Sequence, residues 1–208
     1  MVIAGVLLIM VAVRVWNRRG PARAQPFTGP LAAALLVAVS GLTPDEVGLT
    51  RAGWGYALVA FLIVAAGYGI ALLIPAARRA LGARNHPNPV RKALLGVPLA
   101  TVIFEEIAFR GVLWTLLYHD HGAVWAYVVT AVLFGLWHLP APAEVAFTTL
   151  AGFVLSFLRE VGGGLIAPFV LHWTANGLGI LASAGARRSG PGDSGGDDKS
   201  QVGVVPRR

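Results

Sequence analysis

Apolar runs of membrane-spanning length recur along almost the whole chain, and this pattern restricts the fold more than any other feature. Of the 208 residues, 56% are hydrophobic and only 13% are charged. A run of about 20 apolar residues matches the thickness of a bilayer, where helices satisfy their own backbone hydrogen bonds. Before the tail, no stretch between the runs is long enough for a separate soluble domain. The sequence therefore predicts one all-α domain, a polytopic transmembrane helical bundle.

Glycine, proline and charged residues divide this pattern into about seven expected helices. The expected helices cover residues 1–16, 27–42, 53–74, 92–118 (or 98–118), 123–139, 145–158 and 165–184. Proline at position 140 is expected to end the fifth of them. The last segment, 185–208, is rich in glycine, serine and aspartate and lacks the apolar content to fold. We expect it to be a disordered tail.

The positions of the basic residues predict the orientation of the chain. The net charge is +7, and basic residues gather in the connections after the first and third apolar runs. They are Arg14, Arg18, Arg19 and Arg23, and then Arg78, Arg79, Arg84, Arg91 and Lys92. Such clusters are typical of the cytoplasmic loops of membrane proteins. Nucleic-acid binding is not expected, because these arginines lack the interleaved aromatic residues of a base-stacking surface.

Seven crossings that start outside place both basic connections and the tail on the cytoplasmic side. The first run lacks the positive n-region and the clear cleavage site of a signal peptide, so a retained helix is favoured. We expect an integral, multi-pass protein of a bacterial plasma membrane, with the lipid bilayer as a partner. The chain has no cysteine, so any metal must be bound by histidine, carboxylate or amide groups.

The fourth apolar run contains three charged residues, Glu105, Glu106 and Arg110. Each costs about 2.5–3.5 kcal/mol in a bilayer interior, so such residues need partners and usually have a function. Glu106 and Arg110 are separated by about 40° around a helix and can pair. Glu105 lies about 140° from Arg110 and faces elsewhere. Glu105 is therefore a candidate general base or acid, and a purely structural charge cluster is the alternative.

Two later apolar runs carry further polar side chains. His138 lies close to Pro140, and His172 and Asn176 lie about 6 Å apart on one face of the last run. Each alone is compatible with packing, since polar side chains often hydrogen-bond between membrane helices. Together with Glu105 they supply a base, a polarising group and oxyanion donors, which are the groups that hydrolysis needs.

Three motifs follow one another on successive apolar runs. They are E-E-x-x-x-R at Glu105–Arg110, F-x-x-x-H at Phe134–His138 and H-x-x-x-N at His172–Asn176. This ordered set resembles the CPBP family of intramembrane proteases, which includes the type II CAAX prenyl endopeptidases and bacteriocin-processing or immunity proteins, such as lysostaphin-resistance proteins. The resemblance covers about residues 91–184, the expected protease core. Residues 1–90 would then form N-terminal helices and loops, and 185–208 the cytoplasmic tail.

The resemblance implies a helical membrane domain whose motif helices surround a polar intramembrane cavity. It implies that Glu105 and His138 activate water for attack on a peptide bond of a membrane-associated or prenylated, CAAX-type peptide or protein. His172 and Asn176 would then stabilise the oxyanion. The expected activity is that of an intramembrane endopeptidase, a hydrolase.

The resemblance leaves the type of mechanism open, because the family has been described both as metalloproteases and as glutamate-dependent proteases. A divalent metal such as zinc would be bound by Glu105, His138 and His172. The sequence has no H-E-x-x-H pattern to support a metal by its spacing. Glu106 and Arg110 match the remaining motif positions, as an orienting ion pair.

Two other functions stay open. A non-catalytic membrane immunity or scaffold protein would keep the buried polar cluster for structure alone. A small transporter would use the acidic pair for proton coupling, although the chain lacks the internal symmetry of many transporters. No feature of the sequence indicates a pocket for a prenyl group, so the sequence does not predict whether the peptide substrate is prenylated.

Overall fold

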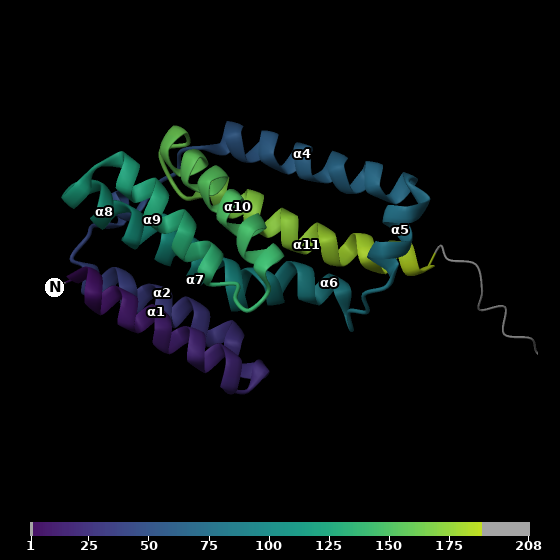
Figure 1. The fold of residues 1–208 in the computed structure, drawn as a ribbon, viewed down its shortest axis with the longest axis horizontal. Coiled ribbons are helices and arrows are strands. Elements are labelled where there is room, and N and C mark those ends of the chain that lie inside the picture. The colour runs from purple at the N-terminus through teal and green to yellow at the C-terminus, as the bar shows by residue number, and fades with distance from the viewer. Residues whose placement is uncertain (1, 189–208) are drawn as a thin grey trace, which may run out of the picture.

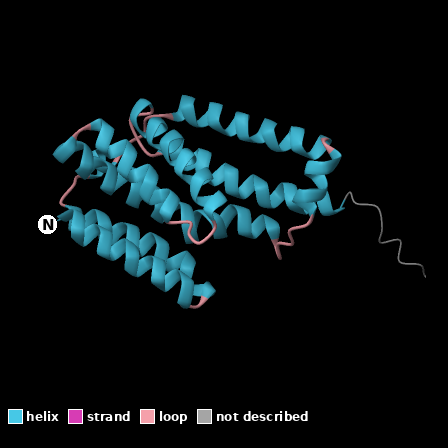
Figure 2. Ribbon diagram, in the orientation of Figure 1, coloured by secondary structure: helices cyan, strands magenta, loops and turns pink. Residues whose placement is uncertain are grey.

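The computed structural model describes residues 2–188, and this part of the chain is built of helices and connecting loops, with no strand (Figure 2). The all-α prediction is confirmed. The first helical elements are α1 (Val2–Arg19), η1 (Ala22–Ala24), α2 (Gln25–Ser40), α3 (Pro44–Val47), α4 (Trp54–Leu73) and α5 (Pro75–Gly82). The last are α9 (Ala123–Leu136), α10 (Pro142–Val161) and α11 (Ile166–Arg188).

Between these groups the chain stays helical from residue 89 to residue 121, which is longer than the fourth expected helix. It consists of α6 (Pro89–Arg91), η2 (Lys92–Gly96), η3 (Pro98–Val102), α7 (Ile103–Glu106), η4 (Ile107–Leu113) and α8 (Trp114–His121), where η2, η3 and η4 have π-helical hydrogen bonding. Proline lacks an N–H and usually interrupts a helix, but here Pro98 lies inside a wide π turn. Such turns are frequent at functional sites, and α7, which carries both candidate glutamates, lies between two of them.

The helices α4 and α11 run side by side in the same direction and form one wall of the molecule (Figure 1). Near the start of α4, Gly53 approaches the backbone of Gly162, just before α11. Towards the other end, the Tyr68 hydroxyl donates a hydrogen bond to the Ala175 carbonyl at 2.7 Å. The first two helices, α1 and α2, form a separate hairpin on the opposite side (Figure 1). The long helix of residues 89–121 lies between these layers and holds most of the buried aromatic core.

One helix of the described chain, α4, is both long and apolar enough to cross a membrane, and it is mostly unburied. Large apolar side chains on its surface, such as Leu62 at 54% and Ile63 at 66% exposure, would be unfavourable in water and suit lipid. The helices α2 and α9 are apolar but shorter. The expected segments therefore exist as helices, whereas seven crossings and their orientation stay a prediction.

Some expected boundaries differ from those observed. The fifth helix ends at Leu136 rather than at 139, and residues 137–140 form a turn with a cis peptide bond before Pro140. The last helix continues to Arg188, four residues into the segment expected to be disordered. The remainder of that segment, 189–208, lies outside the described residues.

Candidate active site

The ion pair expected from helical spacing is present in the buried centre of the molecule. Nη1 of Arg110 lies 3.4 Å from Oε1 of Glu106, and both side chains are almost inaccessible. The guanidinium also donates to the Gly152 carbonyl at 3.5 Å and lies 4.0 Å above the ring of Phe134. A cation over an aromatic face is attracted by the ring quadrupole, most strongly when it is desolvated. Arg110 is therefore held on three sides.

His172 lies between the two glutamates and connects them. Its Nδ1 donates to Oε1 of Glu106 at 2.7 Å, and its Nε2 lies 3.8 Å from Oε2 of Glu105. Because Glu106 engages Nδ1, the Nε2 atom is directed to Glu105. The structure thus brings Glu105, Glu106, Arg110 and His172 together, from two different helices, in one buried cluster.

Taken alone, the four side chains of this cluster are neutral only with one extra proton. Two carboxylates and the guanidinium of Arg110 sum to a net charge of −1, and burying an uncompensated charge is costly. A proton on His172, or on Glu105 beside it, makes the cluster neutral. The contact between His172 and Glu105 therefore provides a place where a proton can reside and move between a carboxylate and an imidazole.

The turn after α9 fixes the other oxygen of Glu105. In this turn the indole Nε1 of Trp137 donates to Oε1 of Glu105 at 2.9 Å. Oε2 of Glu105 is buried and has no hydrogen-bond partner among the described residues. Buried polar atoms are normally satisfied by protein or by ordered water. One oxygen of Glu105 is thus positioned by the protein, and the other is available to a water molecule or a substrate.

The side chain of His138 lies near the cluster and contacts it through an aromatic ring. Its Nδ1 donates to the Phe134 carbonyl at 2.8 Å, which leaves the lone pair on Nε2 when the ring is neutral. The Phe134 ring makes edge contacts with the imidazoles of both His138 and His172, at 5.0 and 5.7 Å between ring centroids. The phenylalanine of the F-x-x-x-H motif therefore packs among the polar groups of the site and sets their spacing.

Two arginines of α1 hold the turn in place, which the sequence interpretation did not anticipate. The side chains of Arg14 and Arg18 both donate to the Leu139 carbonyl. The Arg14 guanidinium also lies 5.0 Å above the Trp137 ring. In the sequence these residues belong to a basic cluster that indicates membrane orientation, and no local signal distinguishes the two that reach the site. Trp137 is the third residue of the site that the sequence interpretation did not anticipate.

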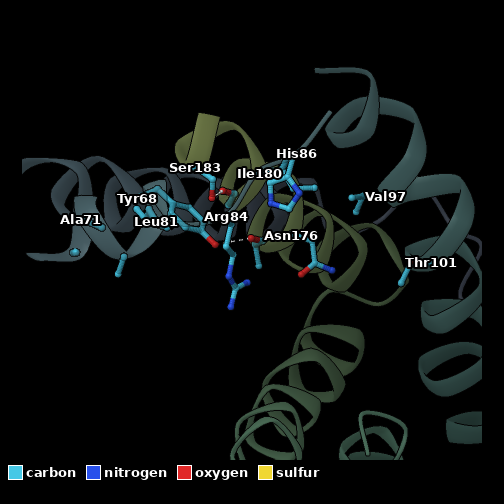
Figure 3. A pocket seen from close by; sticks show the side chains of 14 residues that line it. Tyr68, Ala71, Leu81, Arg84, His86, Val97, Thr101, Asn176, Ile180 and Ser183 are labelled. Atoms are coloured by element: carbon cyan, nitrogen blue, oxygen red, sulfur yellow. Dashed lines mark hydrogen bonds between the residues drawn. The ribbon is translucent and has the colours of Figure 1, made fainter. Parts of the chain in front are cut away.

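Asn176 lies apart from the four clustered groups. It is exposed, one turn beyond His172 on α11, and lines a cavity of about 670 Å³ next to α4 and α5 (Figure 3). No hydrogen bond joins its side chain to another described residue. Its position on the same helical face as His172 is the one expected from the H-x-x-x-N spacing.

The residues suggested for a metal do not come together as ligands. Within residues 2–188, no group of three or more histidine and acidic side chains is close enough to bind a metal ion. Oε2 of Glu105 and Nε2 of His172 are 3.8 Å apart, and both imidazoles use Nδ1 for a hydrogen bond, His138 to the Phe134 carbonyl and His172 to Glu106. Zinc at Glu105, His138 and His172 therefore stays a prediction.

A comparison with protein families finds a match over residues 87–178 to the family described as type II CAAX prenyl endopeptidase Rce1-like. Comparisons with curated proteins and with solved structures find no match. The matched segment contains every residue of the three motifs, from Glu105 to Asn176. Residues 87–178 are therefore similar to the Rce1-like family, a family of membrane-embedded proteases, in agreement with the resemblance that the ordered motifs indicated.

Proposed function

We propose that this protein is an intramembrane endopeptidase that hydrolyses a peptide bond of a membrane-associated or prenylated, CAAX-type peptide or protein. The observation that carries the proposal is the buried pair of Glu105 and His172, in which Oε2 of Glu105 has no hydrogen-bond partner among the described residues. A carboxylate with one positioned and one free oxygen in a buried site suits a general base. The family match over residues 87–178 supports the reaction class.

In the proposed reaction, Oε2 of Glu105 accepts a proton from a water molecule as the water oxygen bonds to the carbonyl carbon of the substrate. The carbonyl π electrons move to its oxygen, which becomes an oxyanion. Collapse of the tetrahedral intermediate breaks the C–N bond, and the proton on Glu105 passes to the leaving amine. The products are a carboxylic acid and an amine.

Three polar side chains would assist these steps. His172 can donate from Nε2 to the oxyanion when both of its ring nitrogens carry a proton, and Glu106 orients the ring because its carboxylate accepts from Nδ1. Asn176, on the same face of α11, is the second oxyanion donor that the motif implies. The free Nε2 of His138 can orient the attacking water. Glu106 and Arg110 position these groups and do not contact the substrate.

We further propose that the protein is multi-pass, with its N-terminus outside. The arginines at the end of α1 and the basic residues between α4 and η2 would then lie on the cytoplasmic side. The turn that carries His138 binds two of those α1 arginines, so the site would be reached from the cytoplasmic side. Neither a prenylated nor a non-prenylated peptide is favoured by these contacts.

The test is hydrolysis of candidate peptides by purified protein in lipid, with Glu105→Gln compared with Glu144→Gln. Glu144 lies in the first turn of α10 and is exposed, so its variant controls for the loss of one carboxylate. We expect Glu105→Gln to lose at least about 100-fold in kcat, the usual contribution of general-base catalysis, and Glu144→Gln to retain activity. Hydrolysis that is undiminished in Glu105→Gln would exclude the proposed role.

The alternative function is a non-catalytic membrane immunity or scaffold protein, and the near-complete burial of the cluster is the observation that favours it. Glu106 and Arg110 are 1% and 0% exposed, as in a structural network. If this alternative holds, Glu105→Gln and His172→Ala keep the biological activity, and only changes at the Glu106–Arg110 pair unfold the protein. The hydrolysis assay on the same variants separates the two functions, and a thermal unfolding measurement identifies the variants that stay folded.

A further inference from the structure

A cavity lies beside the candidate active site, at the level where α4, α5 and α11 meet the long helix of residues 89–121. Its volume is about 670 Å³. The polar side chains around it are Tyr68, Arg84, His86, Thr101, Asn176 and Ser183 (Figure 3). The other lining residues are apolar. The cavity thus combines apolar walls with a few polar groups, as small-ligand sites usually do.

The cavity continues the faces of the two helices that carry the catalytic candidates. Thr101 lies four residues before Glu105, and Asn176 lies four residues after His172, so each is one helical turn from its partner on the same face. One turn corresponds to about 6 Å along a helix axis. A peptide bond held at Glu105 and His172 would therefore have the cavity directly beside it.

The cavity is lined by positive charge and by no negative charge. Arg84 is the one lining residue that is always charged, and none of the lining residues is acidic. Arg84 forms no ion pair with a described carboxylate. Lys92 adds a second positive charge close by, because its Nζ lies 3.3 Å from Nδ1 of His86. An anionic group that entered the cavity would meet a guanidinium and no competing acid.

We infer that this cavity binds the C-terminal end of the peptide substrate, with Arg84 pairing with its terminal carboxylate. The inference rests on the proposed function and defines where the leaving peptide lies. A guanidinium binds a carboxylate through two parallel hydrogen bonds, which gives both strength and direction. Arg84 would therefore select peptides that end close to the bond that is cut.

The dimensions of the site agree with this placement. A CAAX motif is four residues long and ends at the chain terminus. A bond within or next to the motif is thus at most about 14 Å from the terminal carboxylate, at 3.3–3.6 Å per residue. Along α11, the distance from His172 to the far cavity residue Ser183 is about 16 Å. A four-residue extended segment therefore fits between the catalytic groups and the far end of the cavity.

The test compares a prenylated CAAX peptide as the free acid with the same peptide as the C-terminal amide. We expect the native protein to cleave the free acid about 10- to 100-fold more efficiently in kcat/KM, the usual contribution of a hydrogen bond to a charged group. Arg84→Gln should remove this preference by slowing the free acid alone. Arg84→Lys, which keeps the charge but not the bidentate geometry, should restore part of it.

The matched control is Arg79→Gln, which removes one positive charge from α5 without touching the cavity. It should keep the full preference for the free acid. Equal cleavage of acid and amide by the native protein, or an undiminished preference in Arg84→Gln, would overturn the inference.

Binding of both peptides to the Glu105→Gln variant separates the inference from the proposed reaction. If neither peptide is cleaved by the native protein but Arg84 is still needed for tighter binding of the free acid, the subsite stands and the hydrolysis fails. Vesicles with and without an anionic phospholipid test the other source of an anion. Suppose that Arg84→Gln alters how cleavage activity responds to anionic phospholipid and leaves the preference for the free acid unchanged. Arg84 would then contact a lipid headgroup, and the inference would be overturned.

Discussion

Trp137 donates its indole N–H to Oε1 of Glu105 at 2.9 Å, so the residue that precedes His138 in the sequence positions the candidate general base. This hydrogen bond joins the turn after α9 to the centre of the long helix of residues 89–121. It also determines which oxygen of Glu105 is left without a hydrogen bond, because Oε2 has no hydrogen-bond partner among residues 2–188.

We predict that Trp137→Phe lowers activity while the protein stays folded. Phenylalanine keeps an aromatic ring against Phe104 and Phe109, whose centroids lie 6.0 and 5.6 Å from that of Trp137, but it cannot donate to Glu105. Loss of a hydrogen bond to a charged group should reduce kcat roughly tenfold or more. Trp125→Phe is the control, because Trp125 is 59% exposed on α9. Equal activity of the two variants would show that the indole N–H is not used.

The second prediction concerns the arginines of α1 and the turn that they hold. Arg14→Gln and Arg18→Gln each remove one hydrogen bond to the Leu139 carbonyl, and the double variant leaves that carbonyl without either donor. We expect the double variant to lose activity several-fold, because misplacement of a catalytic group by a fraction of an ångström is costly. Arg19→Gln removes an exposed neighbouring charge and serves as the control. A loss of the same size in Arg19→Gln would point to membrane orientation instead.

The sequence was sufficient to predict the helices, because apolar periodicity and helix-breaking residues are local signals. It was also sufficient to pair Glu106 with Arg110, since their spacing along one helix determines their contact. The link between His172 and both glutamates depends on how two helices pack, because Glu106 and His172 are 66 residues apart in the sequence. From the sequence, such a contact can be predicted only through the family motifs. These motifs place the residues in one site but do not give the distances between them.

The parts that could not be predicted are those where a side chain crosses between elements. Trp137 and Arg14 look like ordinary interfacial and loop residues in the sequence, and their roles follow from the packing of α1 against the turn of residues 137–140. The short helix α5 was also missed, because its arginines made the segment resemble a plain basic loop. It supplies one side of the cavity that contains Arg84.

The third prediction separates the two glutamates by their effect on stability. Glu106→Gln leaves Arg110 buried without its carboxylate, and an unpaired buried charge costs about 3–5 kcal/mol. Thermal unfolding in lipid or detergent should show this loss. Glu105→Gln should cost less, because Glu105 forms no salt bridge with an arginine among the described residues and Gln can still accept from Trp137. The double variant Glu106→Gln/Arg110→Gln should recover part of the stability. A larger loss in Glu105→Gln than in Glu106→Gln would contradict this assignment.

The fourth prediction concerns His86, which lies in the loop between α5 and α6. Partial burial, together with the positive charges of Lys92 and Arg84, lowers the pKa of His86 from its ordinary value of 6.5. Removing a positive charge makes protonation easier, so Arg84→Gln should raise the pKa of His86. The midpoint of its imidazole signal in an NMR titration measures the change. Arg79→Gln should leave the midpoint where it is, and a midpoint unmoved by Arg84→Gln would show that Arg84 does not face the cavity.

The last prediction concerns the close packing of α9 against α10. The turn of residues 137–140 connects these two helices. A Cβ atom on Gly135 would lie 1.8 Å from the Thr149 hydroxyl oxygen and 2.8 Å from the Val145 carbonyl oxygen. Gly135→Ala must therefore push the helices apart, and we expect a loss of about 1–3 kcal/mol in unfolding free energy. Gly67→Ala is the matched control, because nothing lies within 4 Å of a Cβ there, and alanine favours a helix by up to about 1 kcal/mol. A thermal melt of both variants measures the contrast. If Gly135→Ala is as stable as Gly67→Ala, the two helices are not packed as closely as described.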